Sequence, residues 1–110
     1  MLNSINIMGR LTKNPELRYT KSEKPVASFS IAVERDIPSS SGERQTDFFE
    51  CVAWGKTGEF ISKYFVKGNM IALAGSLVTS KWQDKDGKDR KNVEINVASA
   101  YFCESKKAEE

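Results

Sequence analysis

Residues 25–35 read PVASFSIAVER, and this stretch carries the clearest strand pattern in the chain. Its odd-numbered residues are apolar from Ala27 to Val33, whereas the even-numbered residues that alternate with them are small or polar. Successive side chains of a strand point to opposite sides of the sheet. The stretch therefore predicts a β-strand with one apolar face and one small or polar face.

Four further segments of the 110-residue chain have β character: residues 4–12, 46–54, 69–82 and 92–103. Gly9 and Gly75 interrupt two of these segments, and a glycine inside a strand pattern indicates a bulge or a bend. Turn signals separate the segments at Asn14-Pro15, in the serine-rich residues 36–45 and at Asp86-Gly87.

Residues 55–67 change to a helical period, in which Phe60, Ile61, Tyr64 and Phe65 form one apolar stripe before Gly68 ends the helix. The order of elements is thus three strands, one helix and two strands. It predicts an all-β fold: an OB-fold, the five-stranded Greek-key β-barrel with one α-helix between strands 3 and 4. We expect this domain to span residues 1–104 and to be followed by a short, charged, disordered tail at residues 105–110.

The predicted core consists of the apolar residues on the inward faces of these elements: Ala27, Phe29, Ile31, Val33, Phe60, Ile61, Tyr64, Val93, Ile95 and Val97. Cys51 and Cys103 are too far apart in the sequence to suggest a zinc motif or a disulfide framework. We expect both to be buried or half-buried thiols in strands.

The composition argues against catalysis. The chain has no histidine, which removes the commonest general base and the commonest metal ligand. Its acids are scattered, and Asp84, Asp86 and Asp89 alternate with lysines in a polar loop, so a metal-dependent nuclease is disfavoured. The sequence therefore predicts no enzymatic activity and no metal site. No 18-residue apolar run and no signal-peptide pattern are present, so no membrane association and a cytoplasmic location are expected.

Several motifs in collinear order resemble one family. They are GRLTKNPELRY at residues 9–19, FSIAVER at 29–35, GERQTDFFECVAWGK at 42–56, Lys67-Gly68, residues 73–82 and the loop at Asp86-Gly87. Together they are similar to the single-stranded DNA-binding proteins of bacteria and phages, over residues 1–102. The resemblance implies an OB-fold that binds single-stranded DNA in replication, recombination and repair, without a cofactor, at the nucleoid.

The resemblance also implies a homotetramer, with a dimer as the alternative, in which residues 3–7 pair with their copy in a second subunit. Family members often end in an acidic tail with Pro-Phe, which docks protein partners. Residues 106–110, KKAEE, lack this tip, so that route to partners is not expected. The sequence leaves open whether a longer tail was removed or the chain is a short phage or plasmid type.

Binding a single strand without sequence preference requires flat rings that stack on bases and cations that contact phosphates. Phe48 and Trp54 are six residues apart in one strand and so share a face, while Trp82 lies beside the polar loop between Lys81 and Lys85. All three positions carry aromatic DNA contacts in the resembled family, although on pattern alone each ring could be core. Near Ile37 the family often has a further aromatic residue, which is missing here.

The candidate phosphate contacts are Arg10, Arg35, Lys56, Lys67 and Lys81, followed by Arg18, Arg44, Lys85 and Arg90. The formal net charge is only +2, and basic residues are interleaved with acids, so any basic groove must be assembled by the fold. Glu50, Val78 and Ser80 stand where some family members carry basic residues. We therefore expect binding to depend more on stacking than on charge.

Three other interpretations remain open from the residues. The chain could be a related OB module such as a primosomal accessory protein or an RNA binder, a barrel that binds only proteins, or a small nuclease. A binding competition between oligo(dT) and oligo(U) distinguishes the first alternative from a single-stranded DNA-binding protein. The second leaves Trp54 and Trp82 without a role unless they line the protein interface, and the third requires the clustered carboxylates that this chain lacks.

Overall fold

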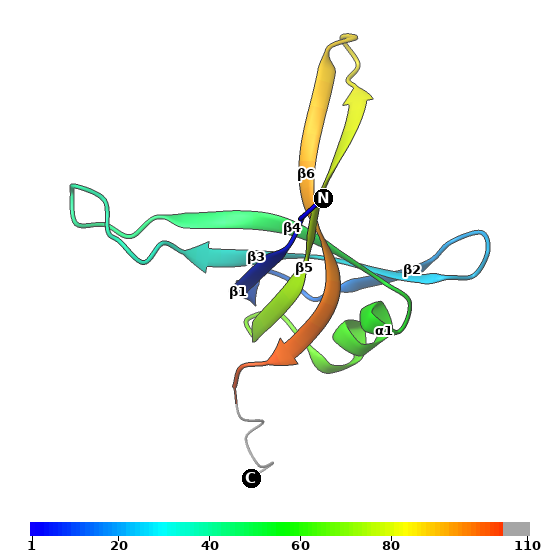
Figure 1. Ribbon diagram of the computed structural model, residues 1–110, viewed down its shortest axis with the longest axis horizontal. Coiled ribbons are helices and arrows are strands. Elements are labelled where there is room, and N and C mark those ends of the chain that lie inside the picture. The colour runs from blue at the N-terminus through cyan, green and yellow to red at the C-terminus, as the bar shows by residue number, and fades with distance from the viewer. Residues whose placement is uncertain (105–110) are drawn as a thin grey trace.

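The computed structural model describes residues 1–104 and contains six strands and one helix (Figure 1). They are β1 (Ile5–Leu11), β2 (Glu16–Tyr19), β3 (Pro25–Glu34), β4 (Thr46–Trp54), α1 (Gly55–Tyr64), β5 (Met70–Gln83) and β6 (Asp89–Phe102). The charged tail expected at residues 105–110 lies outside the described residues.

The strands form one sheet in the order β1-β5-β6-β4-β3-β2, and a further pairing of β1 with β3 closes the sheet into a ring. The pairings are antiparallel except that β4 and β6 run parallel. Helix α1 packs against β3 and β4. This arrangement confirms the predicted all-β class and the OB-fold architecture.

Strand β2 is an addition to the predicted five strands, so the helix follows the fourth strand rather than the third. Its four residues pair only with β3, at Arg18 with Val26 for example. A strand this short has too few residues to show alternation, and the sequence predicts only a turn at the preceding Asn14-Pro15. The pairing with β3 is what makes it a strand.

The two glycines predicted to mark bends occupy points of close backbone approach. The ladder of β5 and β6 shifts register between Ala74 and Gly75, and a Cβ on Gly75 would lie 2.1 Å from the carbonyl oxygen of Asn96. A Cβ on Gly9 would lie 2.8 Å from the carbonyl oxygen of Ala32, where β1 meets β3 and closes the ring. Only glycine allows these backbones to approach so closely.

The core fills the ring and the space beneath α1, and its largest fully buried side chains are Phe29, Phe65, Ile31, Ile61, Ile71, Ile95 and Cys51. Most of the predicted core is confirmed, but Tyr64 and Val93 are 47% and 52% exposed. Tyr64 is the last residue of α1, and Val93 lies where β6 extends beyond the ring. Periodicity identified the face of each residue but not the point where the core ends.

The cysteine prediction was half right, because Cys51 is buried whereas Cys103 is exposed and follows the end of β6. Helix α1 is also shorter than the predicted residues 55–67. It ends at Tyr64, and the amide of the next residue, Phe65, donates to the carbonyl oxygen of Ile61. The side-chain oxygen of Asn14 accepts from the amide of Lys67 and so holds the chain after the helix.

Figure 1 shows the hairpins β3–β4 and β5–β6 extending from the ring in different directions. In β5 the burial changes along the strand, from buried Ile71 and Leu73 to a run of exposed residues from Leu77 to Gln83. Within residues 1–104, the single helix is too short to cross a membrane.

Candidate nucleic-acid interface

The three aromatic residues predicted to stack on bases lie open to solvent. Phe48 is 67% exposed, Trp54 is 50% exposed and Trp82 is 51% exposed. Phe48 and Trp54 alternate along β4 with Phe49, Cys51 and Ala53, which pack toward the core. The alternation predicted from TDFFECVAW is therefore confirmed, and the outward face of β4 presents the two rings.

The strand register places all three rings on one face of the sheet. Trp54 lies opposite Val26 on β3, Glu50 lies beside Glu94 on β6, and Arg90 on β6 lies opposite Trp82 on β5. Each pairing joins even-numbered residues, and directly paired residues point to the same side of a sheet. We call this surface, from Trp54 across β4 and β6 to Trp82, the aromatic face.

The centre of the aromatic face is acidic. Glu50 and Glu94 are register partners on the parallel strands β4 and β6, and they flank the buried Cys51. Burial, followed by the charges of Glu50 and Glu94, raises the pKa of the Cys51 thiol to about 12. Like charges side by side repel a phosphate group, so the centre of this face suits uncharged bases better than the backbone of a nucleic acid.

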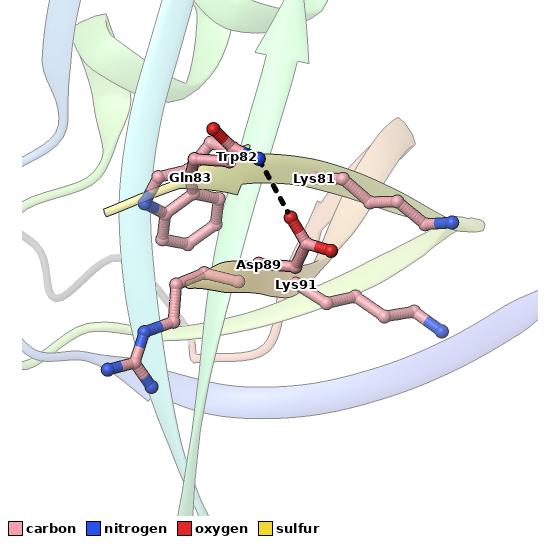
Figure 2. Close-up of a pocket in the computed structure, with 6 residues that line it drawn as sticks. Lys81, Trp82, Gln83, Asp89 and Lys91 are labelled. Carbon is pink, nitrogen blue, oxygen red and sulfur yellow. Dashed lines mark hydrogen bonds between the residues drawn. The ribbon is translucent and has the colours of Figure 1, made fainter. Parts of the chain in front are cut away.

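The β5–β6 hairpin has two different sides. Trp82 and Arg90 lie opposite each other on one side, and Lys81 and Lys91 lie opposite each other on the other. Figure 2 shows the two lysines extending together away from the Trp82 ring, with the side-chain amide of Gln83 donating to a carboxylate between the strands. The open pocket here has a volume of about 470 Å³. The hairpin thus offers a ring on one side and paired ammonium groups on the other.

Lys91 is not among the phosphate contacts predicted from the sequence. Its register with Lys81 follows from the turn at Asp86-Gly87, because residues equally far from the centre of a hairpin turn pair with each other. Lys81 and Lys91 are equally far from Asp86, so the position of the turn predicts this cation pair from the sequence.

Three of the nine cations predicted to contact phosphates form ion pairs with acidic side chains. Arg35 forms two hydrogen bonds with Asp47, at 2.9 and 3.0 Å, and the side-chain hydrogen bond from Arg35 is the main cause that lowers the pKa of Asp47. Arg90 donates to Asp84 at 2.8 Å, and Arg10 lies 3.5 Å from Glu104. These ion pairs are exposed, so each contributes little to stability and a phosphate can compete for the arginine.

Two further arginines are held by uncharged acceptors. Arg44 donates to the carbonyl oxygens of Arg35 and Asp36 in the β3–β4 hairpin. Arg18 donates to the hydroxyl of Ser28 and lies on β2 opposite Val26, which is itself opposite Trp54. The register therefore aligns Arg18 with Trp54 across three strands.

The predicted lysines are exposed: Lys56, Lys67, Lys81 and Lys85. Within residues 1–104, no carboxylate lies within ion-pair distance of them. The nine cations are distributed over the hairpins β2–β3, β3–β4 and β5–β6, α1 and the end of the ring near Arg10, and they do not form one cluster. Ile37, in place of the missing aromatic residue, is 80% exposed in the β3–β4 hairpin.

Comparisons with known proteins identify related chains. Residues 2–103 match the model of the single-strand binding protein family. The chain is 40% identical to single-stranded DNA-binding protein 2 of Listeria monocytogenes, in an alignment that covers 96% of the chain and 66% of the relative. It is 41% identical to a single-stranded DNA-binding protein of Caldanaerobacter subterraneus and 39% identical to single-stranded DNA-binding protein A of Bacillus subtilis. These alignments cover 96% of the chain and 71% and 62% of the relatives, so the chain spans about two thirds of their length.

Proposed function

Because the chain belongs to the single-strand binding protein family, we propose that it binds and protects single-stranded DNA, without sequence preference, during replication, recombination and repair. The observation that carries the proposal is the strand register that puts Phe48, Trp54 and Trp82 on one exposed face. Every base has a flat face, so stacking on these rings does not depend on sequence. The activity is binding alone, without a catalysed reaction or a cofactor, in the cytoplasm at the nucleoid.

The charges favour one orientation of the strand. Glu50 and Glu94 repel phosphates from the centre of the aromatic face, whereas cations stand around it. The bases therefore lie against the aromatic rings while the backbone follows the rim, where Arg18 and Arg90 are available, and Lys81 is available from the other side of the β5–β6 hairpin. Several arginines must give up an ion pair with an acidic side chain before they bind a phosphate. The electrostatic contribution to DNA affinity is therefore smaller than the number of cations suggests.

We further propose that the functional unit is a homotetramer, with a dimer as the smaller alternative. Strand β1 pairs with β5 along Ile5–Arg10 but with β3 only at Arg10 and Leu11, so within residues 1–104 most of its second edge is unpaired. Met8 and Tyr101 are 54% and 57% exposed on the adjoining surface. An exposed strand edge beside apolar side chains fits pairing with a second copy, and light scattering of the purified chain measures the subunit number.

A fluorescence titration with oligo(dT) at two salt concentrations tests the DNA-binding proposal. We expect tryptophan emission to be quenched on binding, and the logarithm of the affinity to fall with the logarithm of salt, with a slope of about −0.7 for each phosphate neutralised. Oligo(U) of equal length, added as a competitor, should displace oligo(dT) only weakly. Unchanged emission at saturating oligo(dT) would contradict the proposal, and preferential binding of oligo(U) would favour an RNA-binding module.

Two matched variants show whether Trp54 acts through its ring. Trp54→Phe keeps a flat face and Trp54→Leu does not, while both keep an apolar side chain at an exposed position. We expect the leucine variant to bind oligo(dT) about 1–3 kcal/mol more weakly than the wild type, and the phenylalanine variant to retain most of that free energy. Equal binding by the two variants would show that Trp54 does not stack.

A further inference from the structure

A second group of aromatic rings lies where α1 meets the end of β6, away from the rings of β4. The ring of Phe102 stacks on that of Phe65, with centroids 4.9 Å apart and planes inclined by 19°. Phe60 and Tyr64 approach Phe102 edge-on, at 5.5 and 6.2 Å. Phe65 is 2% exposed, but Phe102 is 58% exposed. Phe102 therefore has one face covered by the core and the other open to solvent.

The contacts of Phe102 fix the orientation of this open face. Stacking on a core residue and edge contacts from α1 restrict the ring before any ligand arrives. A ligand that stacks on a ring already held in place loses less side-chain entropy than one that must order a mobile side chain. The geometry is thus that of a preformed stacking platform.

The charges beside this platform suit a polyanion. The ammonium of Lys63 lies 5.3 Å from the centroid of the Tyr64 ring. Lys56 and Lys63 are seven residues apart, so they lie on nearly the same side of α1, and both are exposed. Glu59 is the acid between them on the helix. The exposed side of α1 therefore carries two lysines and one glutamate next to aromatic rings.

Helix α1 connects this platform to the aromatic face. Trp54 is the residue directly before α1, and Tyr64 is its last residue. A helix of ten residues is about 15 Å long. A strand whose base stacks on Trp54 can therefore continue along Lys56 and Lys63 to the open face of Phe102.

We propose that Phe102, together with Tyr64 and Lys63, is a further base-stacking site for single-stranded DNA, reached from Trp54 along α1. The inference rests on the proposed function, and it extends the path of the DNA from the sheet to the helix. The site takes a nucleobase on the ring of Phe102 and a phosphate on Lys63. A protein segment is the competing occupant, and the experiments below distinguish the two.

A single reporter tests stacking directly. In the triple variant Trp54→Phe, Trp82→Phe and Phe102→Trp, the only indole of the described chain is at position 102, while flat rings remain at all three positions. We expect oligo(dT) of about 16 nucleotides or longer, the upper site size of one OB domain, to quench this indole as it saturates the protein. Unchanged emission while anisotropy of a labelled oligo(dT) reports binding would overturn the proposal and leave a protein segment as the occupant.

A matched series measures the contribution of the ring. Phe102→Leu keeps an apolar contact with Phe65 but removes the flat face, and Phe102→Tyr keeps the face. We expect the leucine variant to bind oligo(dT) about 5- to 100-fold more weakly and the tyrosine variant to retain most of the affinity. Val66→Ala is the control, because Val66 is an exposed apolar residue just after α1 that no ring contact involves, and its affinity should not change.

The outcomes separate this inference from the proposed function. Equal affinities for the wild type, Phe102→Leu and Phe102→Tyr, with melting temperatures and subunit numbers unchanged, would overturn the Phe102 site but leave the aromatic face intact. Failure of the wild type to bind oligo(dT) would overturn both. If Phe102→Leu does not fold, the Phe102→Trp reporter decides alone, because it keeps a ring on Phe65.

Discussion

The two ends of the β5–β6 pair differ in what surrounds them. At the ring, Ile71 of β5 and Val97 of β6 are buried in the core. Beyond the pair of Leu77 and Ile95 the same strands remain paired as far as Gln83 and Asp89, yet most side chains on both faces are exposed, among them Trp82. Burial of apolar area contributes roughly 25 cal/mol per Å² in the ring and little in the hairpin. The ring therefore carries the stability, whereas the hairpin presents groups to a ligand.

A methyl group on Gly75, near the point where β5 and β6 leave the ring, should have the largest effect on the free energy of unfolding. In Gly75→Ala the new Cβ would lie 2.1 Å from the carbonyl oxygen of Asn96 and 3.1 Å from the Cα of Val97. Both are backbone atoms, so β5 and β6 must separate. We expect the free energy of unfolding, measured by urea denaturation, to fall by about 3 kcal/mol, as for a severe overpacking substitution.

Gly87→Ala at the tip of the hairpin is the control for this substitution. Gly87 has a φ of 77° and no atom near its missing Cβ, so an alanine there is strained only by its backbone conformation. We expect a loss of about 1 kcal/mol. Equal losses at Gly75 and Gly87 would show that close packing at the bulge does not hold the ring together.

Removal of the Trp82 indole from the hairpin should weaken DNA binding but leave folding unchanged. Trp82 is 51% exposed, so we expect Trp82→Ala to change the free energy of unfolding by less than about 0.5 kcal/mol. Binding of oligo(dT), measured by titration calorimetry, should weaken by about 1–3 kcal/mol. Val93→Ala is the matched control, because Val93 is 52% exposed on the opposite side of the same hairpin and should change neither quantity. A large loss of stability in Trp82→Ala would contradict the division between ring and hairpin.

The same division explains which parts of the fold the sequence predicts. Alternation in residues 25–35 and 46–54 correctly placed the apolar faces of β3 and β4 on the core, because each strand has one face on the core along most of its length. It did not predict that the opposite face of β3 is also largely covered, with Val26 and Ser30 buried. Val93 was assigned to the core by the same rule and is exposed. Alternation continues along β6 beyond the ring, and only the closed structure shows where the core ends.

The surroundings of the cationic side chains are harder to predict from the sequence than the exposure of the aromatic side chains. Exposure of Phe48 and Trp54 follows from local alternation, whereas the ion pairs of Arg10 with Glu104 and of Arg35 with Asp47 join residues that are far apart in the sequence or in different arms of the β3–β4 hairpin. Phe102 was assigned to a strand and given no role. Its stacking on Phe65 arises only when β6 packs against α1, so no spacing in the sequence indicates it.

Acid should loosen the hairpin tip before it affects the ring, and this is the smallest of the expected effects. Asp84 accepts hydrogen bonds from the amides of Asp86 and Lys88 and from Arg90. The Lys88 amide and then Arg90 lower the pKa of Asp84 below its usual range. A carboxylate with a lowered pKa stabilises the folded state above the pKa it has in the unfolded chain, and this contribution is lost as the pH falls through the folded pKa.

An NMR titration from neutral to strongly acidic pH follows this loss. We expect the Asp84 carboxyl to titrate below the ordinary aspartate value, and amide exchange at Asp86 and Lys88 to rise as it protonates. The amides of Ile31 and Ile95 should remain protected over the same range, because burial and not an exposed carboxylate holds them. In Asp84→Asn the acid-dependent change at the tip should disappear. If the ring and the tip instead opened together, the hairpin would be part of the cooperative fold, and its exposed tryptophan would have a structural role as well as a binding role.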